Sequence, residues 1–360
     1  MFDFSKTISF PFKYQIPNYV DKHIQEVSVL HRMIKFFRRN LFLFIKRQKN
    51  LEIFAILPNH KNILWINISA PSLGDSLMDL SSRVMLADKN VDLYTSKKNA
   101  HLYFDDEIFR NVFTNKLELI NNIYDLVILD SYSTRSVKIK AKVAPHNLFV
   151  GIYGFFNGPE VNRILYSYHQ LNNLLGYEKS ETEINNIAKN ILSISDIDKS
   201  VVTDFLPKEF IAICIGGEWQ YKTYQKWGDL IEKIFKKNQK INIVLLGSSN
   251  AQRQSQDLIV RFNNYKFIDL VSKLTFNQTA EVIKRSKISI CCDGGLMHAA
   301  NAVNANIIAL IARLKPEMLL VNDNAVALFD KNNVNNIEVE SVFNIYCEMS
   351  SLFDNNLQGE

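Results

Sequence analysis

The chain has 360 residues, of which 47% are hydrophobic and 22% charged, with a formal net charge of +5. This length exceeds one ordinary core and predicts two domains with a cleft. No run reaches the roughly 18 apolar residues that a membrane span needs, and the N-terminus lacks the pattern of a secretory signal. We therefore expect a globular, cytoplasmic protein without a nucleic-acid partner.

The cysteines do not predict a metal centre. Cys214, Cys291, Cys292 and Cys347 lack the spacing of metal ligands, and three of them lie in apolar, strand-like runs. A free thiol in such a run behaves as a small hydrophobic group. We expect neither disulfides nor zinc.

Basic residues are concentrated near the N-terminus. Residues 31–50 (HRMIKFFRRNLFLFIKRQKN) contain seven lysines and arginines and no acidic residue. Apolar residues recur there at helical spacing, from Met33 through Phe37 and Leu41 to Ile45. The pattern predicts a basic amphipathic helix within an N-terminal extension, residues 1–60. Such a helix either packs its apolar stripe on the first domain or lies on an anionic membrane surface.

Strand and helix patterns alternate along the rest of the chain. In a first domain, residues 61–198, we predict strands at 62–69, 91–96, 125–130 and 147–153, and a helix over 74–86. A polar stretch at 195–208 predicts a linker. In a second domain, residues 205–335, we predict strands at 210–217, 241–249, 267–271, 288–293 and 306–311, with helices between them. Apolar strands that alternate with helices indicate two doubly wound parallel α/β sheets.

Glycine-containing loops follow four of the predicted strands. Their sequences are SLGD at 72–75, GGE at 216–218, GSS at 247–249 and DGG at 293–295. Ligands of open α/β sheets bind where strands end, and glycines there let backbone amides and a helix N-terminus approach an anion. The loops therefore predict a phosphate site, with His298 one helical turn further on. Neither a dinucleotide fingerprint nor a P-loop pattern is present.

The order and spacing of these loops resemble a known family, the lipopolysaccharide heptosyltransferases of glycosyltransferase family 9. "SLGD" at 72–75 matches the family's first loop, and "DLVILDSYSTRSVKIKA" matches a strand followed by an Arg-Ser pair, Arg135 and Ser136. "GGEWQYKTY" matches a glycine turn followed by a lysine, Lys222. "DGGLMH" at 293–298 matches the signature Asp-Ser/Thr-Gly-x-x-His, and "LTFNQTAEVIKRSKISICCD" fits the helix and strand before it.

The resemblance, which covers residues 62–325, implies a fold and a distribution of substrates. Family members have two Rossmann-like domains in the GT-B arrangement, with a C-terminal helix, expected at 336–360, that packs back on the first domain. The implied donor-binding residues are Gly216, Gly217, Lys222, Gly247, Ser249, Asp293, Gly294, Gly295 and His298. The implied acceptor-binding residues are Ser72, Gly74 and Arg135.

The resemblance also implies a reaction. Asp75 is the expected general base, and Lys222 the cation that meets the charge on the departing nucleoside diphosphate, so the sugar is transferred with inversion. The expected donor is ADP-heptose and the acceptor a lipopolysaccharide core or related glycan. The implied enzyme needs no cofactor or metal and works in the cytoplasm, bound peripherally to the inner membrane.

Each of these residues has a simpler interpretation. Asp75 follows a glycine before a helix, which is also typical of an N-cap. Lys222 can be a solvated loop lysine, His298 a satisfied helix histidine, and Asp293 a residue that orients the Gly-Gly turn. The acidic stretch FDDE at 104–107 resembles a metal-binding pair but is more typical of a solvated loop.

The sequence also departs from the family pattern. Gly294 stands where Ser or Thr is usual, which removes one hydroxyl donor to the diphosphate. Ser249 stands where users of ADP-heptose place a glutamate near the ribose, and the spacing from Lys222 to Trp227 is short. Two alternatives therefore stay open. One is a GT-B enzyme with another nucleotide sugar or a protein acceptor, and the other is a catalytically silent nucleotide-binding partner.

Overall fold

A computed structural model describes residues 28–120, 122–156 and 161–356, with the backbone alone for 352–356. The chain forms two compact units, which divide between Lys189 and Asn190. The division comes before the predicted boundary at 198, because part of the stretch expected to be a linker is a helix, α8 (Asp196–Thr203), that packs on unit 2 through α11 (Phe276–Arg285). Residues 1–27 of the predicted extension lie outside the described residues.

Unit 1 contains a five-stranded parallel sheet with the order β3-β2-β1-β4-β5. Its strands are β1 (Asn62–Asn67), β2 (Asn90–Thr95), β3 (Phe109–Phe113), β4 (Leu126–Leu129) and β5 (Leu148–Gly151). Its helices are α3 (Val29–Ile45), α4 (Leu73–Asp79), α5 (Thr134–Val143), α6 (Arg163–Leu174) and α7 (Glu181–Ile187). Short 3-10 turns are η2 (Lys49–Leu51), η3 (Ser81–Leu86), η4 (Ala100–Leu102) and η5 (Lys116–Leu119). Four of the strands were predicted, and the edge strand β3 was not.

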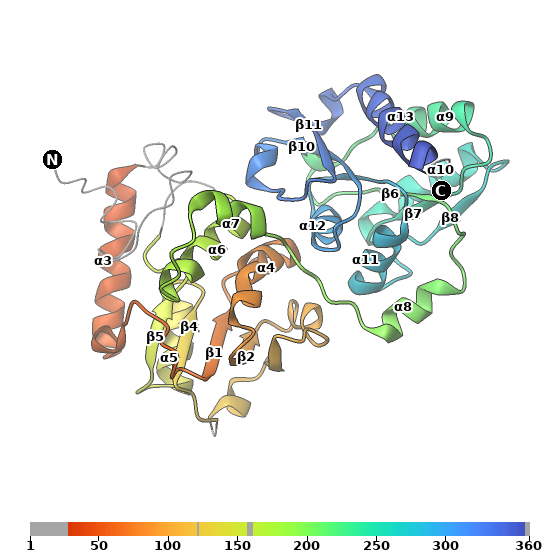
Figure 1. Cartoon of the computed structure of the whole chain (residues 1–360). Coiled ribbons are helices and arrows are strands. Elements are labelled where there is room, and N and C mark those ends of the chain that lie inside the picture. The colour runs from red at the N-terminus through yellow and green to blue at the C-terminus, as the bar shows by residue number, and fades with distance from the viewer. Residues whose placement is uncertain (1–27, 121, 157–160, 357–360) are drawn as a thin grey trace. The chain divides into compact units, whose positions relative to one another are not determined.

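The helix α3 of unit 1 lies on the sheet face that α5 also covers (Figure 1). Leu43 is fully buried in this core, among strand residues such as Leu64 and Val127. The predicted apolar stripe runs from Met33 to Ile45. Met33 is half-buried, but the other side chains of the stripe lie on the outer face of the helix and are exposed. The expectation that this stripe packs on the first domain is therefore wrong.

Unit 2 contains a six-stranded parallel sheet with the order β11-β10-β9-β6-β7-β8. Its strands are β6 (Ile211–Cys214), β7 (Ile243–Leu246), β8 (Phe267–Asp269), β9 (Ser289–Cys292), β10 (Ile307–Ala312) and β11 (Ala325–Asp330). Besides α8 and α11, its helices are α9 (Trp227–Lys237), α10 (Gln252–Arg261), α12 (Gly295–Ala302) and α13 (Val339–Asn356). The 3-10 turns are η6 (Gln220–Lys222), η7 (Ser249–Ala251), η8 (Pro316–Met318) and η9 (Val334–Asn336).

Helices cover both faces of the unit 2 sheet, because alternate residues of its strands are apolar on both sides. On one face Ile213 and Ile290 pack with α9, α10 and α13. On the other face Cys214 and Cys291 pack with α8, α11 and α12, so these cysteines act as small core residues. The arrangement is the predicted doubly wound α/β sheet.

The terminal helix α13 belongs to the core of unit 2. Val342 is fully buried there and Tyr346 nearly so, and the helix contacts α9, β10 and β11. Part of its apolar surface therefore fits the unit 2 core. That the helix also packs back on the first domain stays a prediction.

Candidate active site

Each sheet has a point where newly added strands change sides. In unit 2 this point lies between β6 and β9, and in unit 1 it lies between β1 and β4. Ligands of open parallel sheets bind beyond the strand ends at such a switch point. The loops after β6 and β9 carry most of the predicted donor residues, the neighbouring loop after β7 carries Gly247 and Ser249, and the loop after β1 carries Asp75. Both groups of predicted residues therefore lie where their sheets favour binding.

At the unit 2 switch point, three predicted residues form one cluster. Asp293 is the first residue beyond β9, and its side chain is only 3% exposed. Lys222 reaches it from η6, with Nζ 2.5 Å from Oδ2 of Asp293. His298 is buried in α12, with Nε2 4.0 Å from Oδ1 of the same carboxylate. Lys222 is therefore an ion-paired residue of the switch point, and the interpretation of it as a solvated loop lysine is wrong.

The helix that follows this cluster offers backbone donors. Gly294 is the N-cap of α12 and provides no side-chain cap, so the amides of the first turn lack that partner. Such amides, together with the helix dipole, favour an anion. Gly294 has extended backbone with φ of 173°. A Cβ built there would meet only the Cys292 carbonyl oxygen, at 3.9 Å.

The glycines after β6 and β7 are required by close packing. Gly216 has a φ of +82°, in the left-handed region, and its amide donates to Oε1 of Gln254 at 3.1 Å. A Cβ on Gly247 would lie 2.7 Å from Cβ of Ala251 and 2.9 Å from the carbonyl oxygen of Ile215. These two glycines shape the loops, and the Gly216 amide is engaged within the protein.

The other two predicted donor residues lie beside these turns. A Cβ on Gly217 would collide with Oγ1 of Thr223, which follows Lys222. Ser249 begins η7 beyond β7, and its side chain is exposed. It is therefore open to a ligand at the end of β7.

Arg313, which sequence reasoning missed, lies directly beyond β10, the strand next to β9. Its φ is +71°, and the Leu314 amide donates to the Ala312 carbonyl at 2.9 Å, the pattern of a strained three-residue turn. The guanidinium carbon lies 3.5 Å from the ring centre of Tyr221, the neighbour of Lys222. The sequence pattern that could have identified Arg313 is a basic residue immediately after a buried strand.

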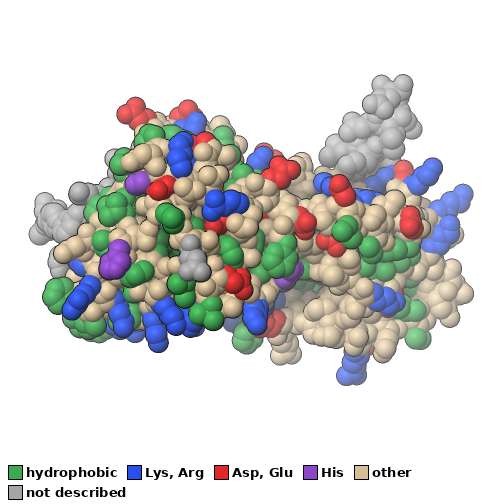
Figure 2. Space-filling model, turned by 90° about the horizontal axis from the view of Figure 1, so that it is seen from below, with side chains coloured by type: hydrophobic (Ala, Val, Ile, Leu, Met, Phe, Trp, Pro, Cys, Tyr) green, Lys and Arg blue, Asp and Glu red, His purple; other side chains and the backbone are tan. Residues whose placement is uncertain are grey.

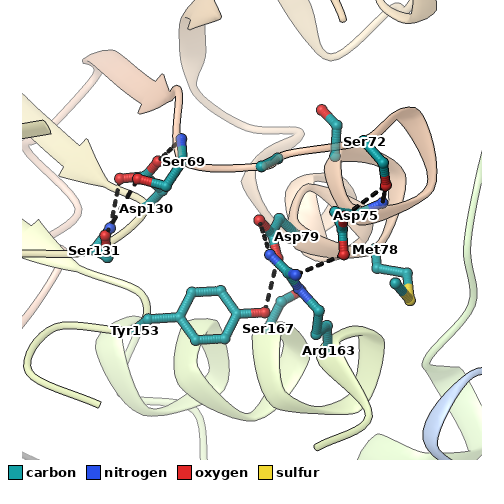
Figure 3. A network of polar contacts seen from close by, with 12 residues as sticks. Ser69, Ser72, Asp75, Met78, Asp79, Asp130, Ser131, Tyr153, Arg163 and Ser167 are labelled. Carbon is teal, nitrogen blue, oxygen red and sulfur yellow. Dashed lines mark hydrogen bonds and ion pairs between the residues drawn. The ribbon is translucent and has the colours of Figure 1, made fainter. Parts of the chain in front are cut away.

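At the unit 1 switch point, Ser72 and not Asp75 is the N-cap of α4. The Ser72 hydroxyl accepts the Asp75 amide at 3.1 Å and donates to Oδ2 of Asp75 at 2.5 Å. The interpretation of Asp75 as an N-cap is therefore wrong. Nη1 of Arg163 donates to Oδ1 of Asp75 at 2.7 Å, and the Asp75 side chain remains 22% exposed (Figure 3). Gly74 lies buried between Ser72 and Asp75 in the first turn.

Arg163 is the centre of a network that sequence reasoning did not find. Its Nε and Nη2 donate to the two carboxylate oxygens of Asp79, each at 2.7 Å, while Tyr153 donates to Oδ1 of Asp79 at 2.9 Å (Figure 3). Burial opposes the charge on Arg163, but Asp79, Tyr153 and Asp75 outweigh it, and the pKa of Arg163 is raised. The network fixes the position of Asp75 with a permanent cation.

A second carboxylate ties the strands of this switch point together. Asp130, directly after β4, accepts the amides of Ile68 and Ser69 at 2.9 and 2.7 Å and the Ser136 hydroxyl at 2.6 Å (Figure 3 shows its contact with Ser69). Burial raises the pKa of Asp130. Arg135 is exposed on α5, with Nη1 3.4 Å from the Ile68 carbonyl oxygen. It is therefore available to a ligand at this edge.

The acidic stretch at 104–107 has a structural role. Asp106 is buried, and its Oδ2 lies 2.5 Å from Nη2 of Arg83, which is also buried. Within the described parts of the chain, no group of three or more His, Cys, Asp or Glu side chains could hold a metal ion. In those same parts, no helix has the length and apolar content needed to cross a bilayer.

Comparison with known proteins gives a family and a fold. Residues 158–345 match the model of glycosyltransferase family 9 (heptosyltransferase). No curated protein sequence matches significantly. Among solved structures, a family 9 glycosyltransferase from Veillonella parvula is 13% identical, covers 82% of this chain and 98% of its own, and has a TM-score of 0.66.

Two further similar structures come from E. coli. ADP-heptose lps heptosyltransferase II is 17% identical over 81% of this chain and 99% of its own, with a TM-score of 0.62. Heptosyltransferase WaaC, whose structure was determined with ADP, is 16% identical over 80% of this chain and 99% of its own, with a TM-score of 0.64. At these identities the likeness shows the fold alone. The prediction of two parallel-sheet α/β domains of the heptosyltransferase type is confirmed.

Proposed function

Because the chain belongs to glycosyltransferase family 9, we propose that it transfers heptose from ADP-heptose, with inversion, to a lipopolysaccharide core or related glycan. The family supports glycosyl transfer in general. The donor is supported by similar structures of WaaC, which were determined with ADP and with ADP-2-deoxy-2-fluoro heptose. The observation that carries the proposal is the Lys222–Asp293–His298 cluster beside the uncapped N-terminus of α12.

This cluster suits the departure of a nucleoside diphosphate. As the bond between the anomeric carbon and the β-phosphate oxygen breaks, negative charge develops on that oxygen. The first-turn amides of α12 and the Lys222 ammonium stabilise this charge, and Asp293 holds the ammonium in place until the diphosphate binds. His298 donates to a phosphate oxygen from the same helix. We propose that the reaction needs neither a metal nor a cofactor.

The acceptor step belongs to unit 1 in this proposal. An acceptor hydroxyl attacks the anomeric carbon as its proton passes to Asp75, which gives a single displacement and therefore inversion. A carboxylate has about four lone-pair sites, so Asp75 can accept this hydroxyl while Arg163 and Ser72 hold it. Arg135 and Ser72 are the proposed contacts to the acceptor, and Gly74 lets the acceptor approach the backbone.

The proposed acceptor also indicates where in the cell the enzyme works. A core glycan under construction is attached to lipid, so its hydroxyl is presented at a membrane surface. We propose that the enzyme works in the cytoplasm, bound peripherally to the anionic inner membrane. The basic segment at 31–50 supports this location.

A second candidate keeps the fold and changes the donor or acceptor. Ser249 offers a neutral hydroxyl where a carboxylate would bind ribose more strongly, which favours a nucleotide sugar other than ADP-heptose. A protein acceptor is compatible with the same Asp75 geometry. In the third candidate, a silent partner, nucleotide binding is retained without transfer.

The test is a calorimetric titration of the full chain with ADP, UDP, GDP and CMP, with and without magnesium. We expect micromolar binding of ADP alone, independent of magnesium and lost in Lys222→Ala. Lys226→Ala is the matched control, because Lys226 pairs with the exposed Glu338 and not with Asp293. Transfer to a delipidated or lipid-linked core acceptor is then assayed with ADP-heptose.

The outcomes separate the candidates. Preferential binding of another nucleotide would support the second candidate, a GT-B enzyme that uses a different donor. Binding of ADP without transfer to any acceptor supports the silent partner, whereas absence of nucleotide binding contradicts the catalytic proposal altogether.

A further inference from the structure

Helix α3 exposes its most apolar face. Leu30, Ile34, Phe37, Leu41 and Phe44 recur at spacings of four and three residues, so they form one stripe along the helix. All five side chains are exposed, for example Phe37 at 56%, Leu41 at 58% and Phe44 at 72%. A continuous stripe of this kind is uncommon on a soluble surface and marks an interaction site.

The opposite face anchors α3 firmly to unit 1. Leu43 is fully buried, the rings of Phe36 and Phe155 lie 4.8 Å apart, and Nη1 of Arg39 donates to the Phe156 carbonyl at 2.9 Å. Just after the helix, Nε2 of Gln48 donates to the Pro145 carbonyl at 3.2 Å. The exposed stripe is therefore presented by a docked helix and not by a free one.

The charges beside the stripe are all positive. Arg38, Lys46 and Arg47 are exposed, and the segment from Ser28 to Asn50 contains no acidic residue. Burial lowers the pKa of Lys35, and the like charges of Arg39 and Arg38 add to this effect. Figure 2 shows Lys and Arg side chains gathered along its lower left margin, next to hydrophobic ones. The surface thus combines an apolar strip with a cationic border.

We propose that the exposed face of α3 is a membrane-docking surface that lies in the plane of an anionic phospholipid bilayer. Its apolar residues enter the boundary between headgroups and acyl chains while the cations contact lipid phosphates. A second copy of the chain fits less well, because pairing two such faces would bring their cations together without any carboxylate. This inference names the surface behind the proposed location and does not depend on the donor.

The test is vesicle flotation of the full chain with phosphatidylcholine vesicles and with vesicles that also contain phosphatidylglycerol. We expect binding to the anionic vesicles only, weakened by salt because the cations are exposed. Leu41→Glu should reduce partitioning about tenfold or more, since it removes apolar burial and adds a buried charge. Arg38→Ala should reduce it about fivefold.

Matched controls make the result specific. Ile197→Glu changes an apolar residue on α8 that is more exposed than Leu41, and it should leave partitioning unchanged. Unaltered ADP titration and thermal unfolding of Leu41→Glu would establish that it is folded. Equal binding by Leu41→Glu and the unsubstituted protein overturns the proposal. So does a concentration-dependent dimer in light scattering that Leu41→Glu abolishes, because that would identify a second copy as the occupant.

A separate observation concerns charge at the end of β10. Lys222 is paired with Asp293, so the two contribute little net charge together. Arg313 is exposed, and among the described residues no carboxylate forms an ion pair with it. A strained turn holds its guanidinium against the Tyr221 ring, 3.5 Å from the centre, beside Lys222. Strain of this kind tends to be retained at functional positions.

We infer that Arg313 is the uncompensated cation that attracts the diphosphate of the donor, an inference that rests on the proposed function. The guanidinium, stacked on Tyr221, provides a planar set of donors that suits phosphate oxygens. Once the diphosphate displaces part of the contact between Lys222 and Asp293, the Lys222 ammonium stabilises the charge on the diphosphate. Binding should therefore depend on salt through Arg313 more than through the paired lysine.

The test compares ADP titration of the unsubstituted protein, Arg313→Ala and Arg313→Lys over a range of salt concentrations. We expect affinity to fall about tenfold in Arg313→Ala, with a shallower salt dependence, and partial recovery in Arg313→Lys. Arg253→Ala, on α10, is the control. If the unsubstituted protein binds ADP and Arg313→Ala binds it equally well, only this inference fails. If no ADP binds to any variant, the proposed function fails instead.

Discussion

The two switch points are stabilised in different ways. In unit 1, buried charged side chains hold the loops, with Asp130 on backbone amides and Arg163 between Asp75 and Asp79. In unit 2, tightly packed glycines such as Gly216 and Gly247 and the N-terminus of α12 shape the loops. A buried charge that loses its partner is costly, whereas a glycine turn tolerates little added volume. Unit 1 should therefore be sensitive to the loss of single partners and to pH, and unit 2 to added side chains.

The largest expected effect concerns the base in unit 1. Asp75→Asn keeps the shape of the side chain but cannot accept the acceptor proton, so transfer should fall about a thousandfold. ADP affinity should not change, because the proposed donor residues belong to unit 2. The measurements are initial transfer rates and calorimetric ADP titration. Near-normal transfer by Asp75→Asn would remove Asp75 from the mechanism.

The next effect tests whether buried charges stabilise unit 1. Arg163→Ala leaves Asp79, whose side chain is 3% exposed, without its bidentate partner. The free energy of unfolding should fall by about 3 kcal/mol. Arg261→Ala is the matched control in unit 2, because Arg261 bridges the exposed Asp229 and Glu232 and should cost less than about 1 kcal/mol. The free energies are measured by urea unfolding. Equal losses of unfolding free energy in Arg163→Ala and Arg261→Ala would contradict the contrast between the two units.

A third prediction concerns pH. Lys140 donates to Oε1 of Gln48 at 2.5 Å and to the Asn147 carbonyl at 2.6 Å, and burial lowers its pKa to about 7. Between about pH 7 and its ordinary value of 10.5, unfolded chains keep a proton that folded chains release. Unfolding free energy should therefore rise with pH across this window, by at most about 1.4 kcal/mol per pH unit.

Lys140→Met removes this contribution and should flatten the rise, as measured by urea unfolding at several pH values in the window. Lys236→Met is the control, because Lys236 is exposed on α9. A rise of the same steepness in Lys140→Met would assign the pH dependence to other groups.

Strands and site residues were predictable from the sequence where a local sequence pattern marks them. The central strands were predicted because their apolar runs are continuous. The edge strand β3 was missed because the polar residues Arg110 and Asn111 interrupt it. The edge strand β11 was also missed, although its first five residues are apolar. Lys222, Asp293 and His298 were predicted because local motifs place them beside strand ends. Asp79 was detectable, four residues after Asp75 on the same helix.

Other features of the site and the fold are not marked by any local sequence pattern. Arg163 lies 88 positions after Asp75 and reaches it from α6, so only the packed structure brings them together. The orientation of α3 was equally hidden, because both of its faces carry large apolar residues, Phe36 and Leu43 on one and Phe37 and Leu41 on the other. Periodicity identifies such a helix without indicating which face is buried.

The smallest expected effect restores a side chain that the family usually has. Gly294→Ser should fit, because the backbone there is extended and a new Cβ would meet only the Cys292 carbonyl oxygen at 3.9 Å. The added hydroxyl can cap α12 or donate to the diphosphate, so ADP affinity should rise about fivefold. Gly247→Ala is the contrasting variant, because its Cβ would lie 2.9 Å from the Ile215 carbonyl oxygen and should weaken both stability and binding. Weaker ADP binding by Gly294→Ser in calorimetry would show that the glycine is required there for close approach of the ligand, which would extend the dependence of unit 2 on its glycines to the anion site itself.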